Sequence, residues 1–237
     1  MSFFYPLITM ERQLPIIDSE IEMSGGCGSA TTINSLDKRK KMRERLPSWF
    51  KTSLPTGLAQ SRYNGTKENV LAHGLNTVCE EARCPNVHDC WGRGTATFMV
   101  AGEVCTRGCR FCAVGTVRDP PDLNPEEPRE LADAVFKMDL SYAVITVVNR
   151  DDLRDGGAIH YRDCIVEVAK KNPNVGLELL CSDLDGNLEA LDTLLDGLPL
   201  RVFAHNVECV PRLDNVVRDY RASFGQSLEI LRTAKEI

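Results

Sequence analysis

The second half of the chain alternates between short apolar runs and segments that are apolar on one side only. The continuous β-branched run 142–148 (YAVITVV) predicts a strand that is covered on both faces. The spacing of Leu131, Val135 and Met138 predicts a one-sided helix over 128–138. By the same criteria we expect strands at 95–101, 175–180 and 200–207, and helices that end near Asn172, cover 188–195 and run from Phe224 to the C-terminus.

Four consecutive strand–helix units predict an α/β fold with a parallel sheet and helices outside it. In a parallel barrel the functional side chains lie at the C-terminal ends of the strands. The predicted strand ends carry polar or reactive residues, at Cys105 onward, 149–152 (NRDD), 181–183 (CSD) and 205–208 (HNVE). We therefore expect a partial parallel (β/α) barrel with its site at this edge. Four strands would leave an uncovered sheet edge, which indicates a missing C-terminal part.

The residues before the first strand are polar and are interrupted by turn signals such as 54–57 (LPTG). We divide the chain into a partly flexible N-terminal extension over 1–45, a cysteine-containing segment over 46–94 and the partial barrel over 95–237. The extension holds the basic run 38–45 (KRKKMRER). A solvated helical face explains such a run, and a docking patch for an acidic partner protein is the alternative.

Composition narrows the functions that the sequence can serve. A chain of 237 residues with 43% hydrophobic residues can bury a substantial core. The net charge of −6 gives no support for nucleic-acid binding, and no apolar run approaches the ~20 residues that span a bilayer. The first residues lack a basic segment, and acidic residues follow soon after, which argues against a secretory or organelle leader. We therefore expect a cytoplasmic protein without a nucleic-acid or membrane partner.

Ten cysteines are present, and six of them fall between Cys79 and Cys112. A reducing compartment makes a disulfide scaffold unexpected, so this dense local group indicates metal ligation. The group consists of two triplets, C-x4-C-x5-C at Cys79, Cys84 and Cys90 and C-x3-C-x2-C at Cys105, Cys109 and Cys112.

The second triplet directly follows a predicted strand, and its thiolates suit an iron–sulfur cluster. A cubane is usually held by four ligands, so three from one loop would leave one iron open. Zinc is the alternative, but zinc usually takes four ligands, and no further Cys or His follows Cys112 at such a spacing. The first triplet lies among charged and polar neighbours, which disfavours its alternative role as buried structural thiols. Both triplets are therefore predicted to bind clusters.

The second triplet, with Phe111 just before its last cysteine, resembles the signature of the radical S-adenosylmethionine (SAM) enzymes. The resemblance implies that SAM chelates the open iron of a 4Fe-4S cluster held by Cys105, Cys109 and Cys112. An electron from the cluster would then cleave SAM to methionine and a 5′-deoxyadenosyl radical. The cofactor supplies this chemistry, and the protein orients it.

Longer segments resemble the lipoyl synthases over about Leu46 to Ile237. They include TVCEEARCPNVHDCW, GTATFMVAGEVCTRGCRFCAVGT, PPDLNPEEP and VNRDDLRDGGAIHY. The resemblance implies a sulfurtransferase that inserts sulfur at C6 and C8 of an octanoyl group on a lipoyl-carrier protein, of the lipoyl-domain or H-protein type.

In that family a second 4Fe-4S cluster is the sulfur donor, which the resemblance assigns to Cys79, Cys84 and Cys90. An electron donor such as ferredoxin or flavodoxin is implied as a further partner. The family's fourth ligand to this cluster is a serine in a C-terminal Arg-Ser-Ser-Tyr motif, which the sequence lacks. We therefore expect the chain to be unstable or inactive by itself.

Polar residues at or near the later strand ends are candidates for contact with SAM, namely Asp151, Asp152, Glu178, Asn206 and Glu208. Their strand-end position favours cofactor contact. The alternatives are a polar turn that caps the next helix, for the two aspartates, and ordinary structural hydrogen bonds for the other three. His205 is expected to be a hydrogen-bonded core residue.

Arginines also occur in the cysteine loops, at Arg83, Arg107 and Arg110. We expect them to tune the cluster potentials through charge and hydrogen bonds. Cys181 and Cys209 follow predicted strands, and small buried thiols are the default interpretation for both.

Two other functions stay open. Another radical SAM enzyme with an auxiliary cluster, such as a methylthiotransferase, would use both triplets, although the longer segments argue against it. A non-catalytic iron–sulfur electron carrier is the other, but such carriers are usually small and ligate each cluster fully with cysteine.

Overall fold

The computed structural model describes residues 54, 56–73, 77–81 and 84–237. The chain divides into two units, Met1–Leu46 and Pro47–Ile237, and all described residues belong to the second. The predicted extension over 1–45, its basic run and Arg83 lie outside the described residues. Among the helices that are described, none combines the length and the apolar content needed to cross a membrane.

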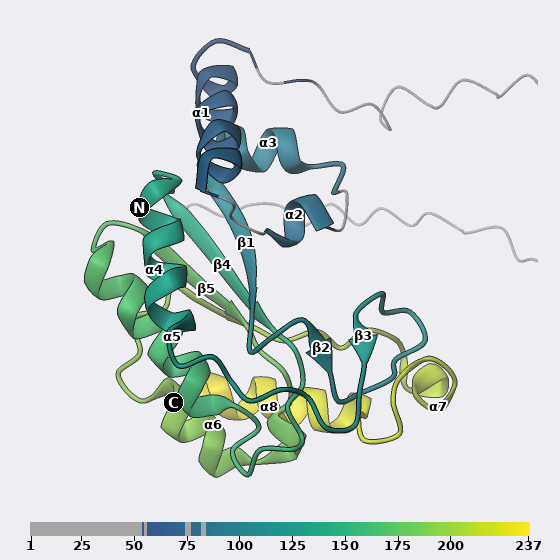
Figure 1. The fold of residues 1–237 in the computed structure, drawn as a ribbon. Helices are drawn as coiled ribbons and strands as arrows, with labels where there is room; N and C mark the ends of the chain where they lie inside the picture. The colour runs from purple at the N-terminus through teal and green to yellow at the C-terminus, as the bar shows by residue number, and fades with distance from the viewer. Residues whose placement is uncertain (1–53, 55, 74–76, 82–83) are drawn as a thin grey trace, which may run out of the picture. The chain divides into compact units, whose positions relative to one another are not determined.

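A four-stranded parallel sheet forms the centre of the described unit (Figure 1). Its strands, in spatial order, are β1 (Thr95–Val100), β4 (Tyr142–Val147), β5 (Gly176–Leu180) and β6 (Val202–Ala204). Thr97 pairs with Val144, Val144 with Glu178, and Glu178 with Val202, so strands that follow one another in this set lie side by side. The apolar, β-branched runs thus form the predicted strands, and the α/β fold with a partial parallel barrel is confirmed.

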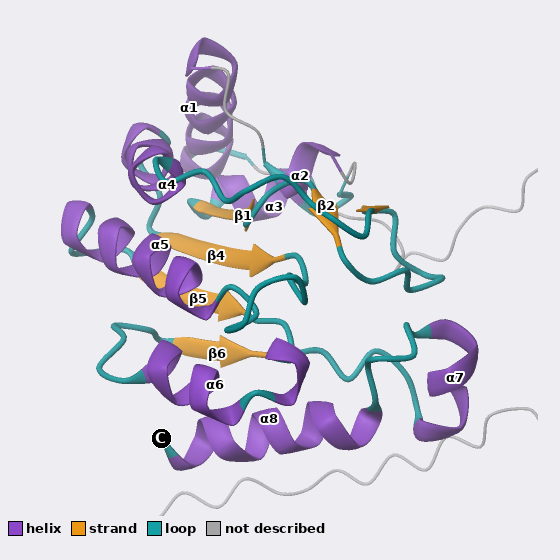
Figure 2. Cartoon of the chain, turned by 60° about the horizontal axis from the view of Figure 1, so that its bottom comes forward, coloured by secondary structure: helices purple, strands orange, loops and turns teal. Residues whose placement is uncertain are grey.

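Three helices connect these strands, α4 (Glu127–Lys137), α5 (Ala158–Lys171) and α6 (Leu188–Leu195). They lie on one face of the sheet, as right-handed crossovers running in one direction must place them (Figure 2). Ile145 of β4 and Leu177 of β5 are almost fully buried in one core with Ile165 and Leu191 of these helices. The one-sided apolar patterns predicted from the sequence therefore bury against the sheet.

The opposite face of the sheet is only partly covered. Along β4, Ala143 and Ile145 are buried, whereas Val144 and Thr146 are half-buried. The expectation that this strand is covered on both faces is therefore wrong, because α4, α5 and α6 all pack on the other side. Thr146 lines a cavity instead.

After β6 the chain forms α7 (Asp214–Val217) and α8 (Phe224–Glu236). Ser223 caps α8, and its hydroxyl oxygen accepts a hydrogen bond from Gln226 N–H at 3.1 Å. The helix was predicted, but its buried side carries Ser227 and Ile230, whereas Leu228 is 39% exposed.

Within the described residues, three helices precede the sheet, α1 (Leu58–His73), α2 (Val78–Glu81) and α3 (Val87–Gly92). The helix α1 was not predicted, because its apolar residues do not share one face: Val70 is buried, whereas Leu58 and Leu71 are exposed. It packs on α3 partly through the ring of Tyr63, whose centroid lies 5.9 Å from that of Trp91.

Candidate active site

The C-terminal ends of the sheet strands border a cavity of about 300 Å³. Residues that follow β4, β5 and β6 form part of its wall, and the loop 105–114 contributes further polar lining. This position agrees with the expectation for a parallel barrel. The volume is at the lower end of the range for small-molecule sites.

Two short strands, β2 (Val104–Cys105) and β3 (Gly115–Thr116), close the base of the loop that carries the second triplet (Figure 1). Thr106 fastens this loop to the end of β4. Its N–H donates to Asn149 O at 3.1 Å, and its hydroxyl donates to the Asp151 carboxylate at 2.7 Å. The loop is therefore fixed against the sheet at its first turn.

Cys105, Cys109 and Cys112 all line the cavity and become more exposed in that order. Backbone N–H groups donate to two of the sulfurs, from Arg107 to Cys105 Sγ at 3.4 Å and from Asp219 to Cys109 Sγ at 3.3 Å. Burial raises the pKa of Cys109, and the hydrogen bond from Asp219 N–H offsets part of that rise. Three soft donors with N–H groups beside them, on one cavity wall, fit the ligand set of a cluster with an open iron.

The first triplet lies on α2, on α3 and on the turn between them, with Cys79 buried and Cys84 and Cys90 half-buried. Cys84 N–H donates to Cys79 O at 3.0 Å, so this turn brings the first two cysteines together. Burial raises the pKa of Cys90, and the neighbouring Cys79 and Cys84 thiols raise it further. A shared metal centre would neutralise the charge of the three thiolates. They also fit a cluster.

Arg107 of the cysteine loop is 3% exposed and is bound by carboxylates. Its guanidinium pairs with Asp151 and with Asp183, each at 2.7 Å, and with Asp185 at 3.3 Å. Burial alone would lower the pKa of Arg107, but the hydrogen bonds with Asp151 and Asp183 outweigh burial and raise it. Burial acts to raise the pKa of Asp151, but the hydrogen bonds that it accepts from Arg107 and Thr106 outweigh burial and lower this pKa. Arg107 is therefore a neutralised structural charge, and its tuning of a cluster stays a prediction.

Asn206 and Glu208 are two of the five predicted SAM contacts, and both line the cavity that the thiols line. Glu208 has a φ of 59°, in the left-handed region that is unfavourable for a non-glycine residue. Such strained residues cluster at functional sites. These two residues are the predicted contacts that the geometry favours.

The other three, Asp151, Asp152 and Glu178, do not border this cavity. Asp151 is held by the arginine network, and Asp152 pairs with Arg150 at 2.8 Å. Glu178 accepts a hydrogen bond from the Tyr142 hydroxyl at 2.9 Å. Each carboxylate thus has a structural partner, and contact with SAM stays a prediction for all three.

His205 is hydrogen bonded on both ring nitrogens, Nδ1 to Cys181 O at 2.9 Å and Nε2 to Ser227 Oγ at 3.0 Å. These bonds match the expectation of a hydrogen-bonded histidine, but His205 is half-buried and lines the cavity, so it is not a core residue. Cys181 is buried, and burial raises its pKa to about 12, so the thiol stays protonated. Cys209 is half-buried with Sγ 3.4 Å from Asp214.

The sequence did not predict Arg218, Asp219 and Arg221, which reach the site from the segment between α7 and α8. Arg218 lines the cavity, is 8% exposed and donates to Ser227 Oγ at 3.0 Å. The hydrogen bond from Arg221 lowers the pKa of Asp219 to about 2. No spacing pattern connects these residues with a loop 110 positions earlier. The charged run R-D-Y-R shortly before a helix cap was the available signal.

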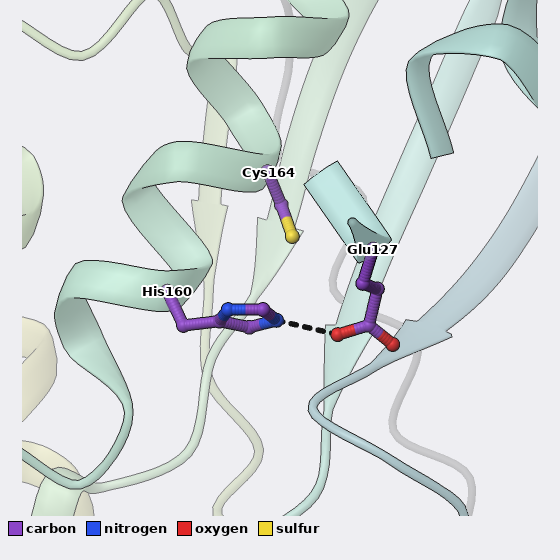
Figure 3. A group of neighbouring side chains, drawn as sticks. All are labelled: Glu127, His160 and Cys164. Carbon is purple, nitrogen blue, oxygen red and sulfur yellow. Dashed lines mark hydrogen bonds and ion pairs between the residues drawn. The ribbon is translucent and has the colours of Figure 1, made fainter. Parts of the chain in front are cut away.

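Glu127, His160 and Cys164 form a separate group of potential metal ligands on α4 and α5 (Figure 3). Their ligand atoms lie within 4.8 Å of one another. However, His160 Nε2 and Glu127 Oε2 are only 2.5 Å apart, and the same oxygen accepts from Ala101 N–H at 2.9 Å. Tetrahedral ligands about 2.0–2.1 Å from a zinc ion lie roughly 3.3 Å apart. We therefore interpret the group as a hydrogen-bonded link between α4, α5 and the end of β1.

A parallel strand–helix sheet with a C-x3-C-x2-C loop at its C-terminal edge defines a radical SAM fold, and comparison with known families agrees. The sequence model of the radical SAM superfamily matches residues 99–237, and the chain belongs to this superfamily. Membership implies a 4Fe-4S cluster and SAM. Residues 26–84 match the N-terminal domain of lipoyl synthase of the radical SAM family.

The similar curated proteins are lipoyl synthases. The chain is 49% identical to the mitochondrial lipoyl synthase of Trypanosoma brucei gambiense, over 84% of this chain and 51% of that protein. It is 47% identical to that of Bos taurus, over 86% and 55%, and 46% identical to that of Leishmania major, over 91% and 53%. The chain therefore spans about half the length of the curated relatives it matches.

These relatives are named as mitochondrial proteins, so the expectation of a cytoplasmic location is wrong. That expectation came from the acidic residues near the N-terminus, which is a weaker signal than kinship with organelle enzymes. The cysteines of the described ranges are nevertheless all free, as the metal-ligand interpretation requires.

Proposed function

We propose that this chain carries the site of a lipoyl synthase, which inserts two sulfur atoms at C6 and C8 of an octanoyl group bound to a lipoyl-carrier protein. The observation that carries the proposal is that the second triplet lines a cavity at the C-terminal edge of the sheet, and that a neighbour of the first triplet lines it too. Val78, directly before Cys79, lines the same cavity as Cys105, Cys109 and Cys112. Similarity to curated lipoyl synthases supports the same reaction.

The second triplet would hold the 4Fe-4S cluster that binds SAM. When bound, the cluster and SAM together supply a radical able to remove hydrogen from an unactivated carbon. The protein's part is to hold the reactants in place and keep water out. Asn206 and Glu208 line the same cavity and would hydrogen bond the polar groups of SAM. Arg107, Asp151 and Asp183 would stiffen the loop beneath the cluster.

The first triplet would hold a second 4Fe-4S cluster that donates sulfur. A substrate radical is short-lived, so its sulfur source must already lie within contact distance. Val78 of the cavity wall directly precedes Cys79, which supports a sulfur source beside the same cavity. An external one-electron donor of low potential, such as ferredoxin or flavodoxin, would reduce the clusters.

The remaining cavity wall is largely apolar and includes Met99, Val114, Val147 and Leu180. An acyl chain gains about 0.8 kcal/mol for each CH₂ group that it buries against such a wall. This supports a fatty acyl substrate over a polar one. The carrier protein would present the acyl group to this wall.

The test is anaerobic reconstitution with iron and sulfide, followed by dithionite, SAM and an octanoyl-lysine peptide. The chain is assayed beside a form extended to the full length of the relatives, which can supply any group contributed by the other half. From the extended form we expect 5′-deoxyadenosine and a peptide heavier by two sulfur atoms, measured by mass spectrometry. Equal rates from the two forms would contradict the expectation that the chain is inactive by itself.

The other functions give different products in the same assay. A methylthiotransferase would form 5′-deoxyadenosine without the two-sulfur peptide in both forms. An electron carrier would form no 5′-deoxyadenosine at all. Either result in the extended form would refute the proposal.

A further inference from the structure

The loop that carries the second triplet is hydrogen bonded to residues 217–219, a segment far away in the sequence. Arg110 N–H donates to Val217 O at 2.9 Å, and Gly108 N–H donates to the Asp219 carboxylate at 3.0 Å. In return, Asp219 N–H donates to Cys109 Sγ at 3.3 Å. The middle of the loop is thus hydrogen bonded from 217–219 on three successive residues.

Arg221 joins this segment to the rest of the site. Its Nη2 donates to Thr106 O at 2.6 Å, and its Nε donates to Asp219 Oδ1 at 2.9 Å. Its Nη1 lies 3.1 Å from Asp151 Oδ2 at the end of β4. One guanidinium therefore connects the start of the cysteine loop, the carboxylate that holds its middle and the sheet edge.

The ends of the loop and its middle are held by different parts of the chain. Thr106 is fixed to β4, and Cys105 and Thr116 are paired by the short strands β2 and β3. Gly108, Cys109 and Arg110 have hydrogen bonds from 217–219, in the part of the chain that the structure describes. The position of the Cys109 sulfur therefore depends on Asp219 and on the arginine that orients it.

We propose that Asp219 and Arg221 are positioning residues for the cluster, acting through Cys109. Together they set where this sulfur lies and which N–H donates to it. Hydrogen bonds to ligand sulfurs and nearby charge are levers on the potential and electronic structure of iron–sulfur centres. The proposal rests on the proposed function only for the presence of a cluster at Cys105, Cys109 and Cys112.

Arg221→Lys and Arg221→Gln separate geometry from charge. Lysine keeps the positive charge but cannot form the planar fork that bonds Thr106 O and Asp219 together. If positioning is the role, Arg221→Lys restores little of what Arg221→Gln loses. Asp219→Ala removes the acceptor of Gly108 N–H directly. Arg129→Gln is the matched control, because its ion pair with Glu126 is exposed and lies on α4.

The first measurement uses the chain without clusters, by hydrogen–deuterium exchange. We expect the Gly108 and Arg110 amides to exchange faster in Asp219→Ala and Arg221→Gln than in wild type. In Arg129→Gln, both amides should exchange at the wild-type rate. Unchanged protection in a folded variant would overturn the proposal. A variant that does not fold is replaced by Arg221→Lys, which makes the smaller change.

The second measurement uses the reconstituted protein in its extended form, by electron paramagnetic resonance with and without SAM. We expect Asp219→Ala and Arg221→Gln to retain iron but to show shifted g values of the SAM-responsive cluster. Misplacement of the Cys109 sulfur should slow 5′-deoxyadenosine formation about 10- to 100-fold per cluster. Wild-type g values and rates in both variants would refute the proposal, whereas a wild type without any SAM response would refute the proposed function instead.

Discussion

Arg107 and Asp183 form an ion pair of 2.7 Å in which both side chains are only 2% exposed. The pair ties the cysteine loop to the residues that follow β5, 76 positions later. Asp151 binds the same guanidinium from the end of β4. One arginine inside the C-x3-C-x2-C motif thus holds the loop to two strand ends at once.

Replacing Arg107 with methionine should therefore destabilise the protein strongly. The substitution leaves the buried Asp183 carboxylate without its cation and Asp151 with Arg221 alone, which costs about 3–5 kcal/mol of unfolding free energy. Asp183→Asn should cost less, because Arg107 keeps Asp151. Urea unfolding of the cluster-free chain measures both changes.

The control for this prediction is Arg129→Met. The Arg129–Glu126 pair is exposed, with side chains 74% and 56% accessible, and should contribute less than about 1 kcal/mol. If Arg107→Met costs no more than Arg129→Met, the buried network does not stabilise the fold.

Asp152 gives a prediction that separates a structural role from a cofactor contact. The hydrogen bond from Arg150 lowers the pKa of Asp152 from its ordinary value of 3.8. A carboxylate with a lowered folded-state pKa stabilises the protein above its unfolded pKa, and that contribution disappears as the pH falls. Asp152→Asn should therefore be less stable than wild type at pH 7, and the gap should close as the pH drops below 3.8.

The measurement is the unfolding free energy of both proteins across this pH range. SAM affinity of the reconstituted proteins is measured in parallel. A weaker affinity with unchanged stability at neutral pH would show that Asp152 contacts the cofactor and that the pairing with Arg150 is secondary.

Gly157 gives a prediction about backbone conformation. It precedes α5 with a φ of 91°, and a Cβ atom there would lie 2.7 Å from the ring of Tyr161. That ring is anchored because its hydroxyl donates to Val148 O and Gly156 O. Gly157→Ala should cost at least about 1–2 kcal/mol for the left-handed conformation alone.

Gly65 is the matched control within α1, where a Cβ atom would meet nothing within 4 Å. Alanine is favoured over glycine in a helix by about 0.5–1 kcal/mol, so Gly65→Ala should stabilise. Thermal unfolding should move the two variants in opposite directions. A shift in the same direction for both would contradict the account of either site.

The sequence pattern predicted the sheet well because its strands are short, apolar and separated by one-sided helices. It failed at α1, where Val70 is buried but Leu58 and Leu71 are exposed, so no face repeats. The thiols of the second triplet could be assigned to one site because they are close in the chain and follow a strand. Spacing along the chain thus predicts which neighbouring residues share a site.

Long-range partners could not be predicted in the same way. Asp151 and Asn206 both occur at strand ends, and only the structure distinguishes the carboxylate neutralised by Arg107 from the amide that lines the cavity. Asp219 and Arg221 were missed because hydrogen bonds across 110 or more residues leave no period in the sequence. The position of the site at the sheet edge was therefore predictable. Which of its polar residues form structural ion pairs and which line the cavity was not.

The two triplets should be separable by single cysteine substitutions. In the extended form, Cys109→Ser removes a proposed cluster ligand that lines the cavity and should abolish 5′-deoxyadenosine formation. Cys84→Ser removes a ligand of the other trio, and should keep 5′-deoxyadenosine formation while abolishing sulfur insertion. Each substitution should lower the iron content by about four atoms per chain, the content of one cubane. Cys209→Ser is the control outside both triplets and should leave iron at the wild-type level. Loss of 5′-deoxyadenosine in Cys84→Ser with intact iron at the second triplet would show that the two centres do not act separately.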